Sequence, residues 1–78
     1  MSASVSFADV QRMLENCAKG ATVRLANHSR LVTYNGKLYR TLPKFDSIEV
    51  GHVRKLIRYL GIDRKCALNH LPASAVPN

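Results

Sequence analysis

The dipeptide Asn35-Gly36 most constrains what this chain can fold into. It separates two runs, residues 31–34 and 37–42, that are rich in apolar, β-branched and aromatic side chains. A two-residue turn of type I′ needs a positive φ at both positions, which Asn and Gly adopt at low cost. The two runs are therefore predicted to be antiparallel neighbours in a hairpin.

An earlier strand is predicted over residues 22–25, followed by a polar turn over residues 27–30. Short connections favour pairing between consecutive strands, so the sequence predicts a three-stranded antiparallel meander. Strict alternation along the third strand places its side chains on two faces. One face would carry Lys37, Tyr39 and Thr41, and the other Leu38, Arg40 and Leu42.

The first predicted helix covers residues 7–19. Ser6 is a favourable N-cap, Asp9 suits the positive end of the helix dipole, and Gly20 can end the helix in a left-handed conformation. Apolar residues recur at helical spacing and predict one buried stripe, made of Phe7, Val10, Met13, Leu14 and Cys17.

A second helix is predicted over residues 47–60, with Asp46 and Glu49 as a capping box and Gly61 as its end. Its core stripe would be Val50, Val53, Leu56, Ile57 and Leu60. A last short helix, capped by Asp63, is predicted over residues 64–70 and is stopped by Pro72.

Both long helices carry a single apolar stripe, and one face of the sheet needs covering. The economical arrangement packs both helices on the same face. This predicts an α+β two-layer sandwich of the double-stranded-RNA-binding-domain type, with the order α-β-β-β-α(-α). Residues 6–71 would form the single domain, residues 1–5 a flexible N-terminus, and residues 72–78 a flexible tail.

Charge is the most informative bulk property of the chain. Twelve Lys and Arg residues against five Asp and Glu residues give a net charge of +7. This balance favours a polyanionic partner, either a nucleic acid or an acidic protein. The other interpretation is a solvated surface with a basic bias.

Other bulk features exclude several classes of protein. The sequence has no apolar run of about 20 residues, and its N-terminus does not resemble a signal peptide. Cys17 and Cys66 are far apart, and each falls on the apolar face of a predicted helix, which predicts buried, reduced thiols in a cytoplasmic protein. No spacing of Cys, His, Asp or Glu matches a metal site, and there is no Gly-rich phosphate loop, so no metal, other cofactor or membrane contact is expected.

Several short motifs, in a shared order over about residues 7–71, resemble the HicA-type family of mRNA interferase toxins. These motifs are Val23-Arg24, His28, Asn35-Gly36, Pro43, Gly51-His52-Val53-Arg54 and Leu60-Gly61-Ile62. The family has Gly-Ser before its histidine, where this chain has Ala26-Asn27. The resemblance implies a small RNA-cleaving enzyme that an acidic antitoxin protein neutralises.

The resemblance makes His28 the candidate catalytic residue. Metal-independent RNA cleavage needs a base for the 2′-hydroxyl group, and histidine titrates near neutral pH. Cations would stabilise the phosphate charge, and aromatic rings can stack on bases. The candidate RNA-binding residues are Arg24, Arg30, Lys37, Arg40, Tyr34 and Tyr39. Without the resemblance, the usual interpretation is different. An isolated histidine in a turn is usually a solvated side chain, and tyrosines in strands usually pack within the sheet.

Three alternatives stay open at this point. The same fold could bind RNA without cleaving it. The second and third helices could form a helix-turn-helix that reads DNA through Arg64, Lys65 and Asn69. The chain could also be a small protein that binds only another protein.

Overall fold

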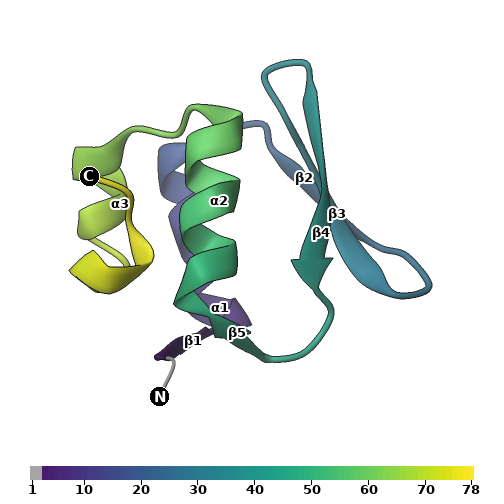
Figure 1. Ribbon diagram of the computed structural model, residues 1–78. Helices are drawn as coiled ribbons and strands as arrows, with labels where there is room; N and C mark the ends of the chain where they lie inside the picture. The colour runs from purple at the N-terminus through teal and green to yellow at the C-terminus, as the bar shows by residue number, and fades with distance from the viewer. Residues whose placement is uncertain (1–2) are drawn as a thin grey trace.

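The computed structural model describes residues 3–78 and is an α+β protein, as predicted. A three-stranded antiparallel sheet has the strand order β2-β3-β4, and a separate two-stranded sheet pairs β1 with β5. The long helices α1 and α2 lie on the same side of the three-stranded sheet (Figure 1). The elements are β1 (Ser4–Ser6), α1 (Phe7–Cys17), β2 (Thr22–Leu25), β3 (Ser29–Tyr34), β4 (Lys37–Pro43), β5 (Ser47–Glu49), α2 (Val50–Leu60), α3 (Arg64–Leu68) and a final 3-10 turn (Ala73–Ala75).

The predicted hairpin is confirmed. Asn35 and Gly36 connect β3 to β4 with φ values of 56° and 78°, both positive as a type I′ turn requires. Tyr34 pairs with Lys37 directly beside the turn. The turn therefore fixes the register of the hairpin at this end.

A β-bulge interrupts β4 near its middle. Arg30 of β3 pairs with Leu42, whereas Val32 pairs with Tyr39, so one more residue separates the two partners on β4 than on β3. Tyr39 and Leu42 therefore face the same side, and both are buried. The predicted strict alternation, which put Tyr39 and Leu42 on opposite faces, is wrong for this reason.

The segment before α2 also differs from the prediction. Residues Ser47–Glu49 are not helical but form β5, which pairs with Ser4–Ser6 and buries Ile48. The helix begins at Val50, and its N-cap Glu49 makes no side-chain capping bond, so the predicted capping box with Asp46 is absent. The pairing also orders part of the expected flexible segment 1–5, of which residues 1–2 lie outside the described part of the chain.

The C-terminal tail also differs from the prediction. Residues 72–78 were expected to be flexible, but Ala75 and Val76 are buried in the core. Arg54 of α2 donates a hydrogen bond to the Ser74 carbonyl, and Nε of Arg64 donates to the Pro77 carbonyl at 2.9 Å. Apolar contact and two charged donors therefore hold the tail against α2 and α3.

One hydrophobic core joins the sheet to the helices. The predicted stripe of α2 is buried throughout, and α2 packs against β4. In α1, Ser6 accepts a hydrogen bond from the Asp9 backbone as predicted, and Val10, Met13 and Leu14 are buried. No helix within residues 3–78 is both long and apolar enough to cross a bilayer.

The cysteine prediction is wrong. Cys17, the last residue of α1, forms a disulfide with Cys66 of α3, and their Cα atoms are 5.6 Å apart. Both residues are half-buried rather than fully buried. Sequence position could not reveal the pair, because 49 positions separate the two cysteines and only the packing of α1 against α3 brings them together.

Candidate nucleic-acid interface

The face of the three-stranded sheet that points away from the helices carries two arginines. Arg24 of β2 pairs with Leu31 of β3, and on the other side of Leu31 the bulge leaves two residues of β4, Arg40 and Thr41. Both arginines are exposed. Neighbouring strands are about 4.8 Å apart, so the two arginine backbones are separated by roughly 10 Å. They flank the half-buried Leu31 on a face that α1 and α2 leave uncovered (Figure 1).

The five acidic residues of the chain all lie outside β2, β3 and β4. Asp9 and Glu15 are on α1, and Asp63 caps α3. Asp46 precedes β5, and Glu49 ends it. The outer face of the sheet therefore has cations without a neighbouring carboxylate on the same strands. This distribution favours an anionic ligand on that face.

The β2–β3 loop lies at the same end of the sheet as these arginines, opposite the β3–β4 hairpin (Figure 1). His28 is exposed in this loop, and no described residue hydrogen-bonds to its imidazole. The adjacent Ser29 donates its hydroxyl to the Arg40 carbonyl at 2.7 Å. Nζ of Lys44, in the β4–β5 loop, donates to the Asn27 carbonyl at 3.4 Å. These bonds place His28 beside the chain segment that carries Arg40 and Lys44.

Arg30 does not lie on the exposed face with Arg24 and Arg40. It points to the helix side, and only 9% of the residue is exposed. Its Nη1 atom donates to the carbonyls of Pro43 and Phe45 at 2.8 and 2.9 Å, and its guanidinium lies 3.5 Å from the ring centroid of Phe7. The guanidinium of Arg30 thus binds other parts of the protein and fixes the β4–β5 loop.

We expect Arg30→Ala to lower the free energy of unfolding by about 2–3 kcal/mol, because it removes two charge-assisted hydrogen bonds and a cation–π contact. Arg24→Ala is the matched control and should stay within about 0.5 kcal/mol of wild type, because that side chain is exposed. Urea unfolding followed by circular dichroism measures both. Equal stability of the two variants would contradict the structural role of Arg30.

The remaining predicted RNA-binding residues also lie away from the outer face. Tyr39 is buried in the core, and the half-buried Tyr34 packs against it. Lys37 is exposed, but its Nζ atom donates to the Tyr59 carbonyl of α2 at 3.2 Å and lies 5.8 Å from the Tyr59 ring centroid. The structure brings Arg24, Arg40 and His28 to one end of the sheet. Tyr34, Lys37 and Tyr39 lie on the helix side instead.

Two exposed aromatic rings did not figure in the sequence prediction. Phe45 in the β4–β5 loop is 67% exposed, and Tyr59 on α2 is 50% exposed. The Phe45 ring has Nζ of Lys44 at 6.0 Å from its centroid, while its carbonyl is held by Arg30. The sequence did contain a signal for Phe45, because an aromatic residue between Lys44 and Asp46 lies in a polar loop. We call Arg24, His28, Arg40, Lys44 and Phe45 together the basic end of the sheet.

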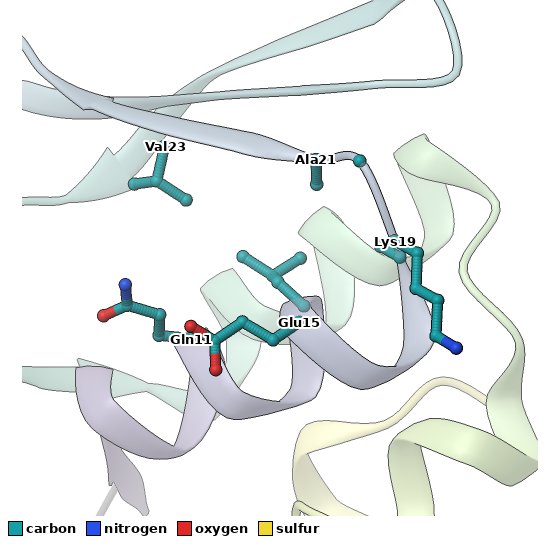
Figure 2. Close-up of a pocket in the computed structure, with 8 residues that line it drawn as sticks. Gln11, Glu15, Lys19, Ala21 and Val23 are labelled. Atoms are coloured by element: carbon teal, nitrogen blue, oxygen red, sulfur yellow. The ribbon is translucent and has the colours of Figure 1, made fainter.

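A pocket of about 320 Å³ lies elsewhere, between α1 and β2. Figure 2 shows Val23 and Ala21 on the strand side, facing Gln11 and Glu15 on the helix. None of the predicted site residues lines it. Its charged lining residues are Glu15 and Lys19, whose charges balance, so the pocket does not extend the basic end.

The predicted DNA-reading helix is short. α3 has five residues, and Nε of Arg64 is already bonded to the Pro77 carbonyl of the tail. Lys65 and Asn69 are exposed. A helix of this length, with one of its three proposed reading residues held by the tail, does not match the usual recognition helix.

Comparison with protein-family models, with curated proteins and with solved structures gave no match to this chain.

Proposed function

We propose that this protein binds single-stranded RNA at the basic end of the sheet. The observation that carries the proposal is that β2, β4 and the β4–β5 loop carry three exposed cationic side chains and one exposed aromatic ring at this end of the sheet, with Asp46 as the one carboxylate in that loop. Arg24, Arg40 and Lys44 would contact phosphates, and Phe45 would stack on a base. Stacking on aromatic side chains and a basic track for the backbone are the usual means of binding single strands.

Arg30 supports this arrangement from inside the fold. Its bonds to the Pro43 and Phe45 carbonyls hold the backbone on both sides of Lys44, while the Phe45 ring stays exposed. A loop whose backbone is already held in place loses less conformational freedom on binding than a free loop.

The proposal includes RNA cleavage by His28, as the resemblance to HicA-type toxins implies. The imidazole is exposed in the loop next to Arg40 and Lys44, so a bound ribose could reach it. His28 would take the proton of a 2′-hydroxyl group, and the neighbouring cations would stabilise the charge that develops on the phosphate. An acidic antitoxin protein would neutralise the toxin by covering the same cations.

Salt dependence tests the binding part of the proposal. Each phosphate contact on a single strand contributes a slope of about −0.7 to log K against log salt, so three cations predict a slope of roughly −2. Fluorescence anisotropy with a labelled, mixed-sequence RNA oligonucleotide measures this slope. The double variant Arg24→Ala/Arg40→Ala should bind more weakly and reduce the slope by about 1.4.

The matched control removes the same charge from the other side of the molecule. Lys55 and Arg58 are exposed on α2, which lies on the helix side of the sheet. Lys55→Ala/Arg58→Ala should leave the slope almost unchanged. If both double variants weaken binding equally, net charge rather than the basic end explains the affinity. A flat salt response of the wild type would refute the proposal.

A further inference from the structure

Three side chains that can bind a metal meet where α1 packs against α3. Cys17 ends α1, Cys66 lies in α3, and His70 follows two residues after α3. One ligand atom from each lies within 4.8 Å of the other two, and all three residues are half-buried. Within residues 3–78, this is the one group of three such ligands.

The local backbone explains why Cys66 and His70 lie on one side. They are four positions apart, and the His70 N–H donates to the Ala67 carbonyl at 3.0 Å, which continues the helical turn past α3. Residues at i and i+4 of a helical turn are neighbours on its surface. Asp63 accepts a hydrogen bond from the Cys66 N–H at 3.0 Å and so fixes the start of this turn. The expectation of no metal site rested on spacing along the chain, whereas the fold adds Cys17 from a distant segment.

Two thiolates and one imidazole are a ligand set that suits zinc. In a tetrahedral site with Zn–S bonds of about 2.3 Å, the two sulfur atoms lie roughly 3.8 Å apart. The disulfide holds the two sulfur atoms at bonding distance, so they must move apart to this separation once the disulfide is reduced. The imidazole already lies close to them, because all three ligand atoms are within 4.8 Å of one another. Because the group is only half-buried, water can reach a fourth position.

We propose that the reduced protein binds one Zn²⁺ ion through Cys17, Cys66 and His70, with water as the fourth ligand. The metal then replaces the disulfide as the link between α1 and α3. A dithiol or phosphine reductant supplies two electrons, and two protons from solution complete the two thiols. Zinc binding displaces those two protons and forms two Zn–S bonds and one Zn–N bond.

Cobalt substitution tests the site directly. The protein is reduced with a phosphine, freed of reductant and metal under anaerobic conditions, and titrated with Co²⁺ and then with Zn²⁺. We expect one Co²⁺ per chain, with the visible absorption of tetrahedral cobalt and a thiolate-to-metal charge-transfer band, both removed by Zn²⁺. The oxidised protein should give neither band, because its sulfurs are bonded to each other.

Two variants and one control complete the test. Cys17→Ser and His70→Ala should each weaken Co²⁺ binding by more than about tenfold, the loss that even an outer-shell partner of a metal site can cause. His52→Ala, on α2 and outside the group, should bind like wild type. Circular dichroism of oxidised His70→Ala shows whether that variant is folded, because its disulfide is intact. Absence of Co²⁺ binding by the reduced wild type, or equal binding by wild type and His70→Ala, would overturn the proposal.

Discussion

Loss of the Cys17–Cys66 disulfide is expected to lower the free energy of unfolding by about 4 kcal/mol. The disulfide links residues 49 positions apart, and closing a loop of this length removes about that much chain entropy from the unfolded state. For a chain of 78 residues, such a loss corresponds to a fall of roughly 15–30 °C in the midpoint of thermal unfolding. Because small domains bury little apolar surface, this is a large part of the total stability.

The measurement compares urea unfolding of wild type and Cys17→Ser/Cys66→Ser, each with and without reductant. A chelator is present throughout, so that no metal takes the place of the disulfide. Reductant should shift the wild-type midpoint to that of the double variant and leave the double variant unchanged. If the wild type unfolds at the same urea concentration with and without reductant, the disulfide does not stabilise the fold and the prediction is wrong.

His28→Ala is expected to reduce RNA cleavage by about 10²- to 10⁴-fold, the usual contribution of a general base. The fold and RNA affinity should change little, because His28 is an exposed loop residue and the phosphate contacts are assigned to other side chains. Cleavage of a labelled RNA should continue in the presence of a chelator, since the proposed mechanism uses no metal.

The control for this prediction is His52→Ala, which changes a histidine on α2 and should cut RNA at the wild-type rate. Equal rates for His28→Ala and wild type would place the activity elsewhere. If the wild type binds RNA but does not cut it, the catalytic part of the proposal is wrong and the non-catalytic binding protein is the better account.

Local sequence signals predicted the elements that depend on local chemistry. The positive φ values of Asn35 and Gly36 followed from the turn type, and the Ser6 and Asp63 caps formed as expected. The buried stripe of α2 followed from helical spacing. In each case, residues within a few positions of one another determine the outcome.

Features that depend on distant partners were missed. The pairing of Ser4–Ser6 with Ser47–Glu49 joins segments more than 40 residues apart, and it converts the expected first turn of α2 into a strand. Val76 is buried in the core, and arginines of α2 and α3 bond to the tail on either side of it, which its own short segment does not signal. The disulfide likewise depends on the packing of α1 against α3.

The bulge had the largest effect on the candidate site. One extra residue in β4 turns Tyr39 into the core and places Arg40 on the outer face beside Leu31. The two residues at the bulge, Arg40 and Thr41, are neither glycine nor proline, so the sequence does not mark the irregularity. Residue type alone therefore could not separate the exposed Phe45 from the buried Tyr39.

Chemical-shift mapping tests most directly whether the basic end of the sheet binds RNA. Labelled protein is titrated with a single-stranded RNA oligonucleotide at low salt and followed by amide and aromatic correlation spectra. We expect the largest changes at Arg24, His28, Leu31, Arg40 and the Phe45 ring, whose protons should move upfield as a base stacks on it. Changes confined to α2, α3 or the Asn35-Gly36 hairpin, with the Phe45 ring unperturbed, would contradict the account.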